Sequence, residues 1–337
     1  MKGPLLTFAA ALTVLAGAVS HTSARSPASV NDAAIFDGMP RALSEFRFFT
    51  VPSKQVSTTA VPYELNTPLY SDGAEKLRFI YVPNGEVLKA DGDGLLEFPV
   101  GSAIIKTFAF GEGAERQLIE TRVLLHRADG WLALPYRWNA EQTDATLALA
   151  GARLPITRPD GSEISYRIPN KNQCKTCHSK DGEVIPIGPK ARNLSREFLT
   201  QLVDAERMVT ITENVDTLPD WNDRAHADTA NLARAYLDVN CAHCHQPGGS
   251  ASNSGLDLRW EQDDPHAIGI RKPPVAAGRG SGGHLVSIAP GNPDASILIH
   301  RMSSTEPGVA MPELGKGTVD EDGVAMLRKW IEGMPTS

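Results

Sequence analysis

The sequence predicts a multidomain chain with two unlike parts: an all-β, sandwich or jelly-roll-like domain over residues 25–168, then a mainly α-helical region over residues 169–337. Turn-forming Gly, Pro, Asn and Asp residues recur at short intervals in the first part, with strand-like runs between them. In the second part, apolar residues recur at helical spacing. About 310 residues remain after the first 24, more than one small domain needs.

Residues 1–24 predict a cleavable signal peptide. The basic start Met1-Lys2 precedes an apolar stretch over residues 5–19, and small residues that suit signal peptidase follow at 18–20 and 22–24. The apolar run is short for a bilayer span and has no charged flank after it, and no later segment is apolar for 18 residues. We therefore expect a periplasmic or secreted protein with no transmembrane segment in the mature chain.

Five runs before residue 168 have the composition of β-strands. They are rich in β-branched and apolar residues, and glycine turns separate them. Many short strands with such turns are typical of a sandwich or jelly-roll. Before them we expect one short helix, over residues 42–49. The expected strands are residues 77–82, 103–110, 117–126, 131–138 and 164–168.

Three helices are expected after residue 168. Ser195 is placed to cap the first, whose apolar residues share one face. The second covers residues 228–239 and runs directly into Cys241. The third begins with the capping-box pattern of residues 318–321. The residues after this pattern form an apolar stripe along the helix.

Two C-x-x-C-H runs, residues 174–178 (CKTCH) and 241–245 (CAHCH), use all 4 cysteines of the chain. This pattern is the attachment signature of c-type haem. The thiols form thioether bonds to the porphyrin, and the histidine gives an axial nitrogen to the iron. Such attachment takes place outside the bacterial cytoplasm, in agreement with the signal peptide. We therefore expect two covalently bound haem c groups, attached at Cys174, Cys177, Cys241 and Cys244, with His178 and His245 as iron ligands.

Two other kinds of site could use these cysteines. A zinc site would take Cys174, Cys177, Cys241 and Cys244 as four thiolates, but it does not need a histidine after each pair. A pair of redox-active C-x-x-C disulfides would want a thioredoxin-like βαβ pattern, which the sequence does not show. Because the chain has only 9 His and both following positions are histidine, we favour haem.

The second motif has the surroundings of a class I cytochrome c domain, over about residues 226–337. A helix leads into the motif and a capped helix closes the chain. Such a domain usually supplies a methionine ligand from the loop before its last helix, where Met311 is followed by a proline. We expect Met311 as the sixth ligand, with Met302 and His300 as reserves; the alternative is that Met311 fills a gap in the core. A His/Met pair raises the reduction potential of the iron.

The first motif follows an expected strand rather than a helix. The carbonyl of Pro189, or else of Pro186, is placed to accept the Nδ1 hydrogen of His178. No methionine here has a ligand-like context, so the sixth position is expected to be open or weakly held. The available side chains, each more typical of a structural or surface residue, are Met208, His226 and His126.

The formal net charge of the chain is −7, and removal of Lys2 with the signal peptide makes it one unit more negative. A mildly acidic surface argues against nucleic acid as a partner. It permits docking onto a basic redox partner protein, although solubility alone explains such a charge. The oligomeric state is not predictable from the sequence.

Further stretches carry a family resemblance: residues 166–169 (YRIP), 235–241 (AYLDVNC), 289–293 (APGNP) with Ser296, Met311-Pro312, Trp330-Ile331, and in the β-rich part 69–73 (LYSDG) and Trp138. With these stretches, residues 165–337 resemble a family of exported bacterial di-haem c-type cytochromes of unassigned function, and the β-rich part resembles that family's N-terminal region. The end of the chain is also similar to cytochrome c domains common in planctomycete proteins. The resemblance implies haem at both motifs and no particular substrate.

Electron transfer is the leading functional hypothesis, with Arg279 as a candidate partner for a haem propionate. The first alternative is a haem-dependent oxidoreductase, resembling a peroxidase, that uses an open first haem. The second alternative is that the β-rich domain binds a carbohydrate or a partner protein. Its aromatic residues Trp131, Tyr136 and Trp138 would then form a binding face, although alternating aromatics in a strand usually pack in a core.

Overall fold

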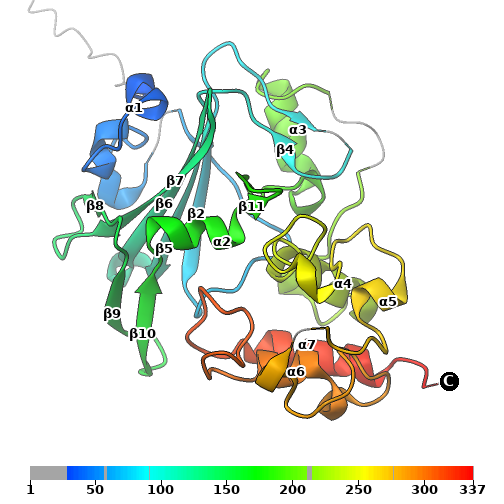
Figure 1. Cartoon of the computed structure of the whole chain (residues 1–337). Helices are drawn as coiled ribbons and strands as arrows, with labels where there is room; N and C mark the ends of the chain where they lie inside the picture. Colours follow the sequence, from blue (N-terminus) through cyan, green and yellow to red (C-terminus); the bar gives the residue numbers. More distant parts are fainter. Residues whose placement is uncertain (1–28, 57–58, 91, 211–214, 276, 337) are drawn as a thin grey trace, which may run out of the picture.

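The computed structural model describes residues 29–56, 59–90, 92–210, 215–275 and 277–336, and the expected signal peptide lies outside these ranges. Figure 1 shows a β-sheet built from the first half of the chain, with α2 in front of it and α4, α6 and α7 gathered beside it. Within the described ranges, no helix is both long and apolar enough to cross a bilayer.

A six-stranded antiparallel sheet forms the centre of the β-rich part. Its order is β1-β2-β5-β6-β7-β8. The expectation of a β-rich region is confirmed, because four of the five expected runs lie in this sheet. The strands are β1 (Val61–Pro62), β2 (Glu75–Tyr81), β5 (Ala103–Phe110), β6 (Gln117–Arg127), β7 (Gly130–Trp138) and β8 (Ala145–Leu147).

The other strands of the described ranges form two-stranded ribbons, so the expected sandwich or jelly-roll is not found. The fifth expected run became β10, which pairs only with β9. The faces of the six-stranded sheet are covered by helices and loops and, in part, by two of these ribbons, because Leu96 of β4 and Tyr166 of β10 share cores with the sheet. The ribbons are β9 (Ala152–Thr157) with β10 (Glu163–Ile168), β3 (Lys89–Ala90) with β4 (Leu96–Glu97), and β11 (Ser179–Lys180) with β12 (Glu183–Val184).

One face of the sheet packs against the segment that precedes it. Ile105 and Leu125 on this face are fully buried with Ile35 of α1 (Asp32–Phe36) and Phe46 of η1 (Leu43–Phe46). The helix expected over residues 42–49 is only this 3₁₀ turn, because Arg47 takes a left-handed backbone conformation (φ 57°) that ends it.

The opposite face packs against residues that come after position 168. Ile104 and Leu124 share a core with Cys174 of α2 (Lys171–Cys177) and with Leu199 of α3 (Arg196–Asp204). Successive strand residues point to opposite faces, so neighbours such as Ile104 and Ile105 fill two different cores. The core on this face therefore spans the expected domain boundary. Ser195 caps α3 as expected, accepting a hydrogen bond from the Phe198 N–H at 3.1 Å.

The helical part is built on the contact between α4 (Thr229–Asn240) and α7 (Glu321–Glu332). The Tyr236 hydroxyl of α4 donates to Asp320 at 2.7 Å, and Gly323 lets the helices approach, since a Cβ there would lie 2.6 Å from that hydroxyl. Asp320, not Thr318, caps α7 through the Gly323 N–H. The remaining helices are α5 (Pro265–Ile268), α6 (Ile297–Met302), and the 3₁₀ turns η2 (Pro52–Lys54), η3 (Gly113–Glu115), η4 (Ala191–Asn193), η5 (Trp221–Asp223), η6 (Ser252–Ser254), η7 (Gly278–Ser281) and η8 (Pro293–Ala295).

Residues 70–72 join the two parts of the molecule. One carboxylate oxygen of Asp72 accepts hydrogen bonds from the backbone N–H groups of Gly317 (2.7 Å) and Thr318 (2.9 Å). The Tyr70 hydroxyl lies 2.8 Å from the hydroxyl of Thr318, and the Tyr70 N–H donates to Asn240 at the end of α4. Thr318 thus binds residues of the β-rich part, whereas the N-cap position of α7 falls on Asp320.

Candidate functional site

The first C-x-x-C-H motif lies on α2 and at its C-terminal end. Asn170 and Gln173 form a reciprocal capping box, with backbone-to-side-chain distances of 2.8 and 3.0 Å, which fixes the start of this short helix. Cys174 and Cys177 are three residues apart and therefore lie on one helix face. Cys174 is buried against the sheet, and His178 follows directly at the helix end.

His178 is held as a potential metal ligand by the carbonyl of Ile185. Its Nδ1 lies 3.1 Å from that oxygen. A carbonyl only accepts, so Nδ1 carries the hydrogen and Nε2 keeps a free lone pair. Burial, helped by the charge of Lys106, lowers the pKa of His178 to about 3 and keeps the ring neutral. The prediction of Pro189 or Pro186 as the partner is wrong, because the β11–β12 hairpin brings Ile185 back to His178 and Pro189 accepts from Leu96.

The second motif continues from α4 and is oriented in the same way. His245 Nδ1 lies 2.9 Å from the Ser254 hydroxyl. That hydroxyl donates its single hydrogen to the Ala251 carbonyl at 2.7 Å, so it must accept from His245. The Nε2 of His245 is therefore also free to bind a metal, and burial lowers the pKa of the ring. Ser254 was not singled out from the sequence, since only the glycine-rich loop around it gives a signal.

The two motifs lie against each other. The ligand atoms of Cys177, His243 and Cys244 all fall within 4.8 Å of one another. The Cys244 sulfur lies 3.8 Å from the Thr176 carbonyl oxygen. A hydrogen bond with the Cys177 thiol lowers the pKa of Cys244. The loops that follow the motifs also meet, since the Asp181 N–H donates to the Gly248 carbonyl at 2.9 Å.

The four-thiolate arrangement of a zinc site is not formed by the residues described. The group brought together takes one cysteine from each motif and adds His243, which is not part of either C-x-x-C pair. Cys174 and Cys241 do not belong to it.

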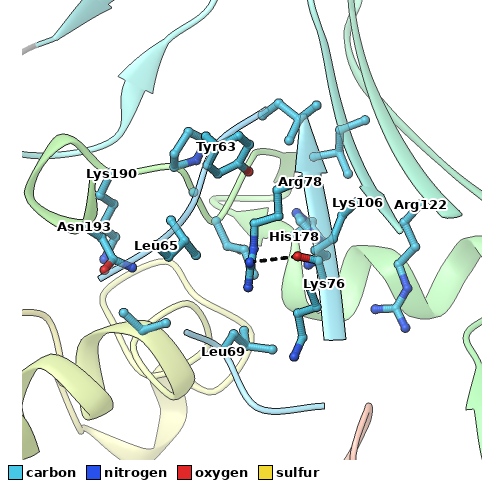
Figure 2. A pocket seen from close by; sticks show the side chains of 16 residues that line it. Tyr63, Leu65, Leu69, Lys76, Arg78, Lys106, Arg122, His178, Lys190 and Asn193 are labelled. Atoms are coloured by element: carbon cyan, nitrogen blue, oxygen red, sulfur yellow. Dashed lines mark hydrogen bonds between the residues drawn. The ribbon is translucent and has the colours of Figure 1, made fainter. Parts of the chain in front are cut away.

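A hollow opens beside His178, and its empty space of about 770 Å³ includes space that is open to solvent. Figure 2 shows His178 at its back and the side chains of β2, β5 and β6 pointing into it. Leu65, Ile104 and Leu124 give it apolar walls, and Lys and Arg side chains share the lining. A concave site that combines apolar walls with a few polar groups is the usual form of a ligand or cofactor site. The free Nε2 of His178, the adjacent Cys174 and the cationic groups fit a porphyrin with carboxylate substituents.

Met311 lies in the loop between α6 and α7. Its N–H donates to the Arg301 carbonyl at 3.1 Å, and its carbonyl accepts from Lys316 at 2.9 Å. Burial lowers the pKa of His245 and the charge of Arg301 adds to this, whereas burial raises the pKa of Cys241 and the charge of Lys316 opposes the rise. Charged residues at both ends of this loop thus act electrostatically on the second motif.

The two reserve ligands of the second haem have structural surroundings. Met302 is 5% exposed and belongs to the core of the helical part. His300 packs edge-on against His284, with 5.4 Å between the ring centres. Arg279, the candidate propionate partner, forms an ion pair with Glu306 at 3.0 Å.

The three side chains considered for the first haem lie outside the lining of the hollow. Met208 is buried in the core that Cys174 shares with Ile104 and Leu124 of the sheet. His226 is exposed and pairs with Asp223. His126 stacks on Trp131, and its Nδ1 lies 2.8 Å from the Phe98 carbonyl oxygen.

The aromatic residues considered as a binding face are mostly in the core. Tyr136 and Trp138 are buried with Phe46, on the face of the sheet that packs against the segment preceding it. Trp131 packs against Phe98 and His126. These residues therefore stabilise the sheet rather than form a surface for a ligand.

Comparisons with known proteins do not assign the chain to a family. A scan of family models, a search of curated proteins and a search of solved structures each found no match. The functional argument therefore depends on the motifs and on the geometry around them.

Proposed function

We propose that the protein is an exported di-haem c-type cytochrome that carries electrons. The observation that carries this proposal is the contact between the two C-x-x-C-H motifs, in which Cys177 and Cys244 lie within 4.8 Å of each other. Groups attached at these residues are held close together by the protein, and short separation is what electron exchange between two centres requires. Each bound haem would supply an iron that changes oxidation state.

The chain's own residues have distinct parts in this function. The four cysteines are the covalent attachment points, and His178 and His245 offer Nε2 to the metal. The Ile185 carbonyl and the Ser254 hydroxyl fix the two rings through Nδ1. Residues 226–337 would form a class I-like cytochrome c domain, a proposal that the packing of α4 against α7 supports. Met311 would be the sixth ligand of the iron in that domain.

The test is a haem count on protein matured in a host that attaches haem c. We expect the processed chain to have the mass of the polypeptide plus two haems. We also expect potentiometric titration to give two steps that depend on each other, because the sites are adjacent. The same chain without residues 1–24 is the control and should stay unmodified. A bare polypeptide, or zinc in place of iron, would refute the proposal.

A haem-dependent oxidoreductase is the second candidate. It is favoured by the hollow beside His178, which opens to solvent and whose described lining has no methionine and no other histidine. A site of this kind leaves room for a small ligand next to the first motif. High-spin absorption of one haem, with a reaction on addition of peroxide, would favour this candidate over a pure electron carrier.

Met311→Ala tests the proposed sixth ligand. Loss of the thioether is expected to convert one haem from low spin to high spin and to lower its reduction potential, because a methionine ligand raises it. The measurement is the visible spectrum with a potentiometric titration. Met302→Leu is the matched control, since this volume-conserving change in the core should leave both haems unaltered. If Met302→Leu gave the spectral change and Met311→Ala did not, the assignment would be wrong.

A further inference from the structure

A row of cationic side chains crosses the sheet beside His178. Arg78 of β2 lies directly opposite Lys106 of β5, and Lys106 lies directly opposite Arg122 of β6. Opposite residues on neighbouring strands share a face. All three side chains, together with Lys76, therefore point into the hollow, as Figure 2 shows.

The hollow contains much more positive than negative charge. Its described lining has five Lys or Arg side chains and no Asp or Glu. Like charges directly opposite each other across strands destabilise a sheet. A row of three cations at the centre of a sheet is thus unfavourable unless negative charge lies close to it.

The nearby carboxylates neutralise only the edges of the row. Glu120 is fully buried and binds Arg122 at 2.6 Å. Glu64 lies 3.9 Å from Arg78, but its side chain is 87% exposed. At the far side of the hollow, Asp238 pairs with Lys190 at 2.7 Å.

Lys106 is left at the middle of the row. Among the residues that the structure describes, its ammonium has no hydrogen-bond or ion-pair partner, and it lies over the Phe108 ring, 5.3 Å from the ring centre. Burial and the adjacent guanidinium groups lower its pKa to about 7. An anion in the hollow would offset both the burial of the ammonium and its repulsion from the guanidinium groups.

We propose that Arg78, Lys106 and Arg122, with Lys76 beside them, form a binding site for an oxyanion next to the first motif. Guanidinium groups bind carboxylate and phosphate oxygens through paired N–H donors, and an ammonium between them adds a point charge. The oxyanion has two possible sources: the propionate carboxylates of a haem held by His178, or a free oxyanion from solution. Only the first source depends on the proposed function.

The experiment compares Lys106→Met with Lys89→Met in the full mature protein, after the haem content of each has been measured. Lys89 is exposed on β3 and outside the hollow, so it is a control for loss of one charge. Lys106→Arg keeps the charge and should restore wild-type behaviour. Inorganic phosphate, titrated by calorimetry, is the probe for a free oxyanion, and the reduction potential of each haem is the probe for propionates.

If a free oxyanion binds, phosphate binds the wild type, and Lys106→Met weakens it by about tenfold or more while Lys89→Met does not. If propionates occupy the row, phosphate does not bind, but Lys106→Met shifts the potential of one haem and Lys89→Met shifts neither. The proposal is overturned if phosphate does not bind and Lys106→Met leaves both potentials where Lys89→Met leaves them. If the protein proves to lack haem, the phosphate titration alone decides: binding that is lost in Lys106→Met supports the row, and no binding overturns it.

Discussion

The variant with both Cys241 and Cys244 replaced by serine is expected to carry one haem instead of two. Serine cannot form the thioether bonds that the second motif supplies, and His245 alone would not retain the group through denaturation. The first motif keeps its own thiols at Cys174 and Cys177, so its haem should remain. Denaturing mass spectrometry measures the result directly, as a loss of one haem mass per chain.

The reciprocal variant, with serine at Cys174 and Cys177, is the matched control and should keep only the second haem. The two variants should differ in spectrum, because His178 and His245 have different surroundings. Each should also titrate in a single redox step, because only one haem remains. If either double variant kept both haems, covalent attachment at these pairs would be wrong.

Glu120→Ala is expected to destabilise the fold by about 3–5 kcal/mol, because it leaves a buried charge without its partner. Glu120 is 0% exposed and accepts hydrogen bonds from Arg122 at 2.6 and 2.9 Å and from the Tyr166 hydroxyl at 2.7 Å. Burial by itself lowers the pKa of Arg122, but the charge and hydrogen bonds of Glu120 raise it above the ordinary value. The measurement is the free energy of unfolding in urea.

Two further variants separate the charge from the hydrogen bonds. Glu120→Gln keeps a hydrogen-bond acceptor of the same shape, so it should be less destabilising than Glu120→Ala. Adding Arg122→Met to Glu120→Ala removes the unpaired charge and should recover much of the loss. An alanine variant as stable as the wild type would show that the ion pair does not support this face of the sheet.

The strands were predictable because their apolar runs are bounded by turns. A run such as residues 103–110 is buried on both faces, and composition alone reveals that. The sequence does not say what covers each face, and here helices, loops and two short ribbons do so where a second sheet was expected. The helix expected over residues 42–49 is longer than the 3₁₀ turn found at Leu43–Phe46, because the left-handed backbone of Arg47 ends that turn.

The candidate site was predictable to the extent that its chemistry is local in sequence. The cysteine and histidine spacing identifies the two motifs, whereas their contact depends on tertiary packing. Ile185 and Ser254 reach the histidines through turns whose geometry composition does not reveal. Arg78, Lys106 and Arg122 are ordinary surface residues by composition, and only strand register brings them into one row. Met311 as an iron ligand stays a prediction.

The bonds from Tyr70 and Asp72 to Thr318, and the core shared across residue 168, determine how this molecule can be dissected. A fragment ending at residue 168 would expose Ile104 and Leu124 to water. A fragment beginning there would leave Cys174 and Leu199 without the sheet beneath them. We therefore expect neither fragment to fold well on its own, and substitution within the intact chain is the better way to study each part.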